Sequence, residues 1–287
     1  MPSVELSDRS VLLATGPDAE TLLQNVLTTD LSSLSEGEAR PGALLTPQGK
    51  ILFDFLISRA GADGFRLDCR RDVAPDFLKR LMLYRLRAKV DFSLQDRELV
   101  SAFWQEESSP SENDSTTLVD RRFPAGLNVQ RTYGPGAGGA DREAWDRLRI
   151  EHGVAESGSD YALGDAFPHD ILFDQNGGVG LKKGCYVGQE VVSRMHHRGT
   201  ARRRLVIAKG ESPLPPSGTD VTAAGRSIGT LGTVSGREGL ALLRIDRAAE
   251  AAKEGVPILA GDVALALSVP AFANFTISAA DGRTETA

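Results

Sequence analysis

The pattern of the chain changes near residue 200, and this change limits the fold more than any other feature. Before that point, segments with apolar residues at helical spacing alternate with strand-like segments. After it, short alternating segments follow one another with glycine or turn residues between them, from RRRLVIAKG to DVALALSV. Such a series of short strands is typical of a closed barrel or a sandwich. We therefore predict an α+β region over residues 1–199 and a β-barrel domain over residues 200–287.

The first region combines helix and hairpin patterns. DAETLLQNVLTTDL follows Gly16-Pro17-Asp18 and has its apolar residues at helical spacing. GALLTPQGKILFDFLISRA predicts a hairpin with its turn at Pro47-Gln48-Gly49. Further strands are predicted in GFRLDC, VDFSLQD, LVSAFWQ and NVQRTYG, and further helices in APDFLKRLMLYRLRAK, REAWDRLRIEHG and QEVVSRMHH. Residues 105–116 are polar and predict a surface loop. The order of these elements indicates two ferredoxin-like units.

Composition excludes several classes of protein. The net charge of -6 and the pI of about 5.4 argue against wholesale non-specific binding to nucleic acid. No run approaches the roughly 20 apolar residues of a membrane span, and the first residues do not resemble a signal peptide. The four histidines and two cysteines include no zinc-site spacing, so no metal site is predicted. We expect a cytoplasmic monomer that does not bind membranes.

One cysteine stands in an unusual setting. Cys185 lies in KKGCYVGQE between Gly184 and Gly188, just before a predicted helix. A helix N-terminus and the neighbouring Lys182 and Lys183 favour the thiolate form. A thiolate would suit redox exchange, iron or sulfur ligation, or nucleophilic attack. The alternative is a structural cysteine in a tight turn, which is the commoner role of a free cysteine.

The segment over residues 167–205 resembles the YgfZ family, whose members are folate-binding, iron–sulfur cluster maintenance proteins related to the T-protein (aminomethyltransferase) of the glycine cleavage system. The family signature K-G-C-Y-x-G-Q-E stands here as KGCYVGQE over residues 183–190, followed by Arg198-Gly199. Weaker similarity to the T-protein covers nearly the whole chain. The resemblance implies a tripartite fold, with two ferredoxin-like units around a central opening for tetrahydrofolate and a C-terminal antiparallel β-barrel.

The resemblance also implies a function. The chain would bind tetrahydrofolate, or a one-carbon derivative of it, and support the assembly or repair of iron–sulfur clusters, with tRNA modification as one route. Cys185 would be its functional thiol, and iron–sulfur client proteins or assembly factors its partners. The alternative is a tetrahydrofolate-dependent aminomethyltransferase. A third reading is a binding module in which the signature docks a partner without chemistry.

Two further segments match the T-protein. Asp54 in GKILFDFLI matches the second acid of that family's G-G-I-L-D-D-L-I, which lies by the reactive end of folate, so it is the second candidate catalytic residue beside Cys185. Phe53 stands where the T-protein has its first acid. The alternative is that Asp54 faces water from the polar side of an alternating strand. Arg149 and Glu151 in LRIEHG match the T-protein's R-L-E.

The folate-binding residues that the resemblance implies are Lys183, Tyr186, Gln189, Glu190, Arg149 and Glu151. Each has a structural alternative. Lys183 could pair with the glutamate tail of folate or stand in water. Glu190 suits the first turn of a helix through the helix dipole alone.

A basic run follows the signature and consists of Arg194, His196, His197, Arg198, Arg202, Arg203 and Arg204. Clustered cations can bind phosphates or polyanions. No aromatic residues interleave for base stacking, so tRNA binding is weakly supported. The polyglutamyl tail of folate, a protein partner or a solvated face fits the run better.

Overall fold

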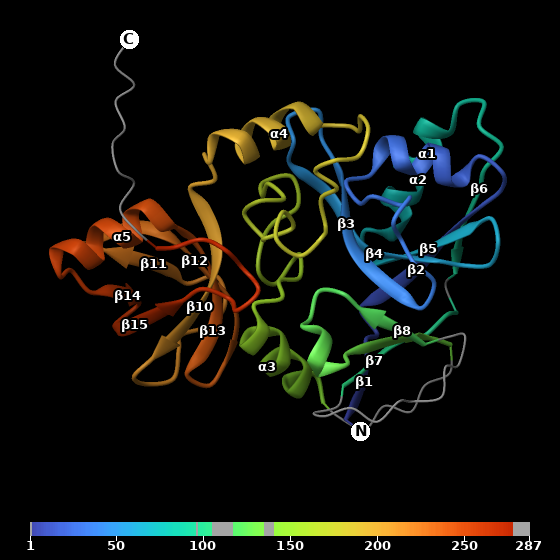
Figure 1. Ribbon diagram of the computed structural model, residues 1–287. Helices are drawn as coiled ribbons and strands as arrows, with labels where there is room; N and C mark the ends of the chain where they lie inside the picture. Colours follow the sequence, from blue (N-terminus) through green and yellow to red (C-terminus); the bar gives the residue numbers. More distant parts are fainter. Residues whose placement is uncertain (1, 96, 105–116, 135–140, 278–287) are drawn as a thin grey trace, which may run out of the picture.

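The computed structural model describes residues 2–95, 97–104, 117–134 and 141–277. Figure 1 shows two bodies: a large mixed sheet with its helices, and a barrel made by the C-terminal part. The segment between α3 and α4 lies between them. The predicted surface loop over residues 105–116 lies outside the described residues.

The sheet is built from the first nine strands of the described chain. They are β1 (Ser3–Glu5), β2 (Arg9–Thr15), β3 (Glu38–Leu45), β4 (Ile51–Arg59), β5 (Gly64–Arg70), β6 (Asp91–Gln95), β7 (Val100–Phe103), β8 (Thr117–Asp120) and β9 (Gln130–Tyr133). Their order is β1-β7-β9-β8-β3-β4-β5-β2-β6. The two halves join where β3 pairs in parallel with β8, and the other neighbours are antiparallel.

The helices α1 (Ala19–Val26) and α2 (Ala74–Arg85) share one hydrophobic cluster with the sheet. The rings of Phe53 and Phe55 on β4 stack on Phe77 of α2, with centroids 4.9 and 5.4 Å apart. Because side chains alternate along a strand, Asp54 and Leu56 face the opposite side of the sheet. Leu56 packs there in a second cluster, in which α3 (Arg142–His152) takes part. Asp54 is thus turned toward the interior of the molecule.

The barrel is closed by six antiparallel strands in the order β10-β13-β12-β11-β14-β15. These are β10 (Arg203–Gly210), β11 (Asp220–Ala223), β12 (Arg226–Ser235), β13 (Glu238–Arg244), β14 (Ile258–Ala260) and β15 (Val263–Ser268). The helix α5 (Ile245–Glu254) packs against its core through Ala248 and Ala251. The predicted fold class, α+β with a C-terminal antiparallel barrel, is confirmed.

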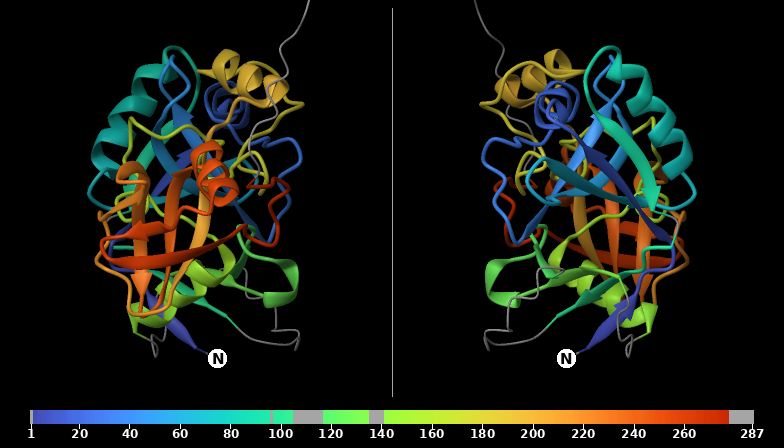
Figure 2. Two further views of the ribbon diagram at one scale, coloured as in Figure 1. Left: turned by 90° about the vertical axis from the view of Figure 1, so that its left-hand side faces the viewer. Right: turned by 90° about the vertical axis from the view of Figure 1, so that its right-hand side faces the viewer.

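The remaining elements are α4 (Gln189–Arg198) and the short 3₁₀ helix η1 (Ala125–Leu127). Figures 1 and 2 show α4 at the same end of the molecule as α1, opposite the N-terminus. None of the described helices combines the length and apolar character that crossing a membrane would require.

The hairpin with its turn at residues 47–49 and the predicted helices are present. Four strands were not predicted: β1, β2, β8 and β14. Three of them have only three or four residues, too few to show an alternating pattern. In β2 nearly every residue is buried, so that strand has no polar face to reveal its period.

Candidate functional site

The signature loop, residues 182–188, ends a long connecting segment between α3 and α4 over residues 153–188. That segment has none of the named helices or strands and is held by hydrogen bonds to distant elements. Gly180 N donates to Thr28 O at 2.8 Å, and Thr28 Oγ1 donates to Gly178 O at 2.6 Å. Ile51 N donates to Ala166 O at 2.8 Å. The segment is thereby fixed against the chain after α1 and against the β3–β4 hairpin.

The side chain of Lys183 is buried and binds backbone carbonyls of the protein itself. Its Nζ donates to Leu27 O at 2.8 Å and to Thr29 O at 2.7 Å, and only 9% of the residue is exposed. Burial lowers the pKa of Lys183 to about 8, and the carboxylate of Asp30 opposes that shift. The ammonium group also lies 5.3 Å from the ring centroid of Tyr186. These contacts make Lys183 an anchor of the signature loop, with its ammonium group already engaged by two carbonyls.

Gly188 is required by the shape of the same loop. It caps the N-terminus of α4 in the left-handed conformation, with φ of 78°. A Cβ atom at this position would stand 2.6 Å from Thr46 O and 3.1 Å from Gly49 Cα. The tip of the β3–β4 hairpin therefore docks directly on the start of α4, and a side chain would separate them. Gly184 differs, since its φ is not positive and nothing lies within 4 Å of the place for its Cβ.

The thiol of Cys185 is exposed, whereas the other cysteine, Cys69, is sealed in the core. Burial raises the pKa of Cys69 to about 12, so that thiol stays protonated and inert. Cys185 stands between a buried anchor at Lys183 and a buried ring at Tyr186. The thiol is thus presented to solvent from a loop that is held on both sides.

A pocket of about 240 Å³ lies between the signature loop and α4. We call it the α4 pocket, and it is lined by Gly180, Leu181, Lys182, Tyr186, Gln189, Val192, Ser193, His196 and His197. It brings together the predicted residues Tyr186 and Gln189. Burial raises the pKa of Tyr186 to about 12, so its hydroxyl is a neutral donor at pH 7. Glu190 faces away in an exposed ion pair with Arg194, at 2.5 Å.

Asp54 lies beside a different pocket. It is only 8% exposed, and Ser157 Oγ donates to its Oδ1 at 2.5 Å. Ser157 also lines a pocket of about 490 Å³, which we call the Ser157 pocket. Its lining residues are Asp8, Arg9, Arg70, Arg71, Asp72, Glu156, Ser157, Gly158 and Ser159. Asp54 therefore does not face water freely. It lies behind a hydroxyl at the wall of a pocket of ligand size.

Arg149 belongs to a buried ion network next to this pocket. Its guanidinium is fully buried and donates to Asp160 and Asp146, each at 2.8 Å, and to Thr233 Oγ1 at 2.9 Å. Its Nε stands 3.5 Å from Glu156 Oε2. Arg149 thus holds α3, the connecting segment and the barrel together and does not reach a ligand.

Glu156 belongs to the same ion network and lines the Ser157 pocket. Burial alone would raise its pKa, but the surrounding arginines, Arg149 first among them, hold the pKa well below its usual range. Its Oε1 has no hydrogen-bond partner, although Arg122 and Arg131 lie within 4 Å. Oε1 is sealed from solvent, so it faces the arginines of the network and not the pocket.

Glu151 lies apart from both sites. It is exposed and lines a pocket between α3 and the barrel with Arg147, Ile150, Lys209, Ser235, Arg237 and Glu238. The Ser157 pocket and the α4 pocket share no lining residue. The pocket wall at Ser157, which binds Asp54, and the pocket beside the signature loop that carries Cys185 are thus separate.

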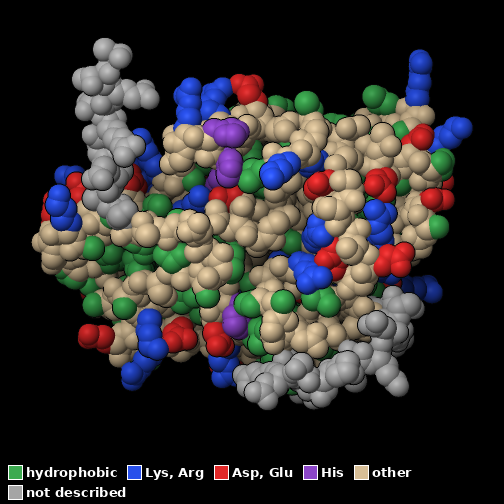
Figure 3. All heavy atoms as spheres, viewed as in Figure 1, with side chains coloured by type: hydrophobic (Ala, Val, Ile, Leu, Met, Phe, Trp, Pro, Cys, Tyr) green, Lys and Arg blue, Asp and Glu red, His purple; other side chains and the backbone are tan. Residues whose placement is uncertain are grey.

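The basic run after the signature is partly neutralised. Arg194 pairs with Glu190, Arg203 with Asp165 and Asp170, and Arg204 with Asp174. These partners reduce the positive charge that the run can offer to phosphates. In Figure 3, histidine side chains gather over α4 next to Lys and Arg side chains.

One group of described residues has ligand atoms close enough to hold a metal ion: His169, Asp174 and His196. Burial lowers the pKa of His169 to about 4, so its imidazole is neutral at pH 7. The sequence does not predict this group, and it does not predict Ser157 or Glu156. For Glu156 and Ser157 the available signal is the stretch LRIEHGVAESG over residues 148–158, which resembles the segment before the signature in both families.

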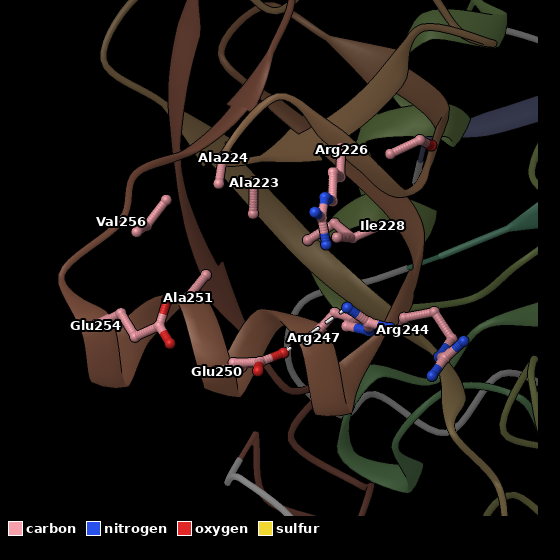
Figure 4. A pocket seen from close by; sticks show the side chains of 11 residues that line it. Ala223, Ala224, Arg226, Ile228, Arg244, Arg247, Glu250, Ala251, Glu254 and Val256 are labelled. Carbon is pink, nitrogen blue, oxygen red and sulfur yellow. Dashed lines mark ion pairs between the residues drawn. The ribbon is translucent and has the colours of Figure 1, made fainter.

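The barrel has a pocket of its own, of about 460 Å³. Figure 4 shows it between α5 and the β11–β12 hairpin, with the ion pair between Arg247 and Glu250 at its edge. Its walls contain none of the predicted site residues. We assign it no role.

Residues 202–275 match the family model of the C-terminal β-barrel domain of CAF17. The human protein named iron–sulfur cluster assembly factor IBA57, mitochondrial, is 32% identical over 92% of this chain and 83% of its own length. The mouse protein of the same name is 31% identical over 83% of this chain and 76% of its own length. Both relatives are named as mitochondrial, which corrects the cytoplasmic location expected from the sequence.

Among solved structures, the glycine cleavage system aminomethyltransferase T from Bartonella henselae has a similar fold. Its TM-score is 0.73, and the match covers 95% of this chain and 86% of that one. At 18% sequence identity this similarity concerns the fold. The T-protein-like architecture expected from the sequence is confirmed.

Proposed function

Because this chain belongs to the IBA57 family of iron–sulfur cluster assembly factors, we propose that it supports iron–sulfur cluster assembly with Cys185 as its thiol ligand. The observation that carries this proposal is the contrast between the exposed Cys185 and the sealed Cys69. A cluster is typically held by about four ligands. Cys185 would supply one, and an assembly factor or client protein would supply the others.

The loop around Cys185 supports shared ligation. Lys183 and Gly188 fix its two ends, so little conformational freedom is lost when the thiolate binds. Gly184 has no side chain and stands in open space, which lets the backbone of another chain come close to the sulfur. The YgfZ-like signature thus has a physical use at each of these positions.

The thiol role is tested by Cys185→Ser, with Cys69→Ala as the matched control. In cells that lack the native protein, we expect the Cys185 variant to fold but not to restore iron–sulfur enzyme activity, whereas the control restores it. In a mixture with a cluster-loaded donor protein, the Cys185 variant should also fail to retain the visible absorbance of the cluster. Full restoration by Cys185→Ser would reject the thiol role.

We also propose that tetrahydrofolate, or a one-carbon derivative of it, binds in the Ser157 pocket. The residues there fit this ligand. The N–H edge of a pterin suits the hydroxyl of Ser157 and the carboxylate of Glu156 at the pocket wall. Arg71 at the rim suits a carboxylate of the glutamate tail, whereas Arg70 is already paired with Asp72. When bound, the folate would carry or accept a one-carbon unit, and Asp54 would orient Ser157 through their hydrogen bond.

Calorimetric titration with tetrahydrofolate tests this assignment. Arg71→Ala should weaken binding about tenfold or more, because a hydrogen bond to a charged group contributes roughly 1.5–3 kcal/mol. Arg226→Ala, in the barrel pocket, should leave binding unchanged. The absence of heat and of any thermal shift with the wild-type protein would reject folate binding. Equal losses in the two variants would reject the Ser157 pocket as its place.

One-carbon transfer is the second candidate function, and the burial of Asp54 at the wall of this pocket favours it. A buried carboxylate can accept a proton during transfer of an aminomethyl group. Asp54→Asn should then abolish turnover while tetrahydrofolate still binds. A lack of turnover in the wild-type protein, supplied with an aminomethyl donor, would remove this candidate. A route through tRNA modification has less support, because the basic run is partly ion-paired.

A further inference from the structure

We propose that His169, Asp174 and His196 form a binding site for one divalent transition-metal ion at the end of α4. The ligand atoms that the three side chains offer all lie within 4.8 Å of one another. Two imidazoles and one carboxylate are a ligand set that suits Zn²⁺ and Fe²⁺ and leaves further coordination positions open. The site contains no cysteine, so it is chemically distinct from the Cys185 thiol.

His169 is the first reason for this assignment. It is only 1% exposed, and neither Nδ1 nor Nε2 has a hydrogen-bond partner. A buried polar group without a partner is rare and costs stability, so it calls for a bound ion or water. The backbone of His169 is fixed as well, since its carbonyl accepts from Arg204 Nη1 at 2.7 Å. The ring is therefore held in place with an unused nitrogen lone pair.

The surroundings of Asp174 are the second reason. Arg204 Nη1 donates to Asp174 Oδ1 at 2.7 Å, and Gln175 Nε2 donates to Oδ2 at 2.9 Å. Outer partners of this kind orient a metal-binding carboxylate, and each carboxylate oxygen still has a free lone pair. The positive charge of Arg204 also offsets the negative charge of the Asp174 carboxylate. Binding would therefore rely on the imidazole nitrogens, which favours transition metals over Mg²⁺ or Ca²⁺.

His196 supplies the access route. It is exposed, lies in the last turn of α4 and lines the α4 pocket. Its ring centroid is 6.3 Å from that of His169. Ligand atoms around a tetrahedral Zn²⁺ stand about 3.3 Å apart, as follows from metal–ligand distances of about 2.0–2.1 Å. The site must contract when it binds, and the exposed His196 side chain is the one free to move inward.

Titration of metal-free protein with Co²⁺, followed by visible absorption and by competition with Zn²⁺, tests the site. We expect one Co²⁺ per chain. His196→Gln should weaken binding at least about tenfold, since even loss of an outer partner costs roughly 10–100-fold. His197→Gln is the matched control, because it changes the adjacent histidine of the same helix, and binding should stay within about twofold. Cys185→Ser should leave Co²⁺ binding unchanged, which separates this site from the proposed thiol ligand.

His169→Leu provides a second readout. Without metal, replacing an unpartnered buried imidazole by an apolar side chain should leave the melting temperature unchanged or raise it. The rise in melting temperature that Zn²⁺ produces in the wild-type protein should be absent from this variant. The proposal is overturned if Co²⁺ does not bind one per chain, or if His196→Gln binds like the wild type. Equal losses in the His196 and His197 variants would identify an adventitious surface pair and also overturn it.

Discussion

Gly188→Ala tests how the signature loop is held. In the wild-type chain the residue adopts φ of 78°, and a Cβ atom would stand 2.6 Å from the carbonyl oxygen of Thr46. The carbonyl oxygen of Thr46 cannot yield easily, because it belongs to the backbone. The new methyl group would also meet Gly49 Cα at 3.1 Å. The substitution must therefore either strain α4 or lift the hairpin tip away from it.

The expected cost has two parts. An alanine in the left-handed region costs roughly 1–2 kcal/mol, and a methyl group forced into a packed contact costs about 1–3 kcal/mol. We therefore expect Gly188→Ala to lower the free energy of unfolding by about 2–5 kcal/mol. For a chain of this size, such a loss lowers the melting temperature by on the order of 10 °C.

Urea denaturation and thermal melting measure this effect, and Gly184→Ala is the matched control. Gly184 lies four positions earlier in the same signature, has no positive φ and has open space around it. Its substitution should change stability by no more than about 0.5 kcal/mol. Equal stability of the two variants would refute the docking of the hairpin on α4. If Gly184→Ala nevertheless failed to support iron–sulfur enzyme activity, close approach of a partner to Cys185 would be supported.

Three further outcomes are expected. Arg149→Met should lower the free energy of unfolding by about 3–5 kcal/mol, since it leaves Asp160 buried without its cation and removes one of the arginines around Glu156; a loss below about 1 kcal/mol in urea denaturation would contradict this. Because Glu156 has a depressed pKa in the folded state, its stabilisation is complete above about pH 4.3 and is lost as the pH falls further. Thermal melts across that range check this, and a flat profile would speak against the network. The pKa of Lys183 is lowered to about 8 in the folded protein, whereas an unfolded chain keeps its lysine protonated up to about pH 10.4. Between these values the unfolded state binds more protons, so the contribution of Lys183 to stability rises with pH. Lys183→Met should lack that contribution, and the difference between the two pH profiles measures it.

Local patterns are enough to predict much of the fold. The hairpin turn at residues 47–49, the amphipathic helices and the short strands after residue 200 all carry their signals within a few neighbouring residues. The same patterns do not predict where Asp54 points. Its strand alternates, so it has an apolar and a polar side, but the polar side is covered by the connecting segment around Ser157. That cover comes from a part of the chain more than 100 residues away.

The same limit applies to the site residues. The sequence indicates a special role for the signature, but it does not show that Lys183 is buried against carbonyls of Leu27 and Thr29. Nor do His169 and His196 have a motif spacing, because an irregular segment brings them together. Cys185 was the exception. Its position just before a predicted helix follows from neighbouring residues, and it lies exposed before α4.

The contact between the barrel and the rest of the molecule has a consequence for truncated chains. Thr233 in β12 accepts from Arg149 through its hydroxyl and donates through its backbone N–H to Asp160 Oδ1 at 2.7 Å. Gly232 also packs so closely on Asp160 that a Cβ there would stand 2.5 Å from Oδ1. A premature stop before β12 would therefore remove more than a separate module, because it would open charged groups of the remaining protein to water and leave them without their partners. Such a fragment should be degraded rather than persist as a shortened, partly active form.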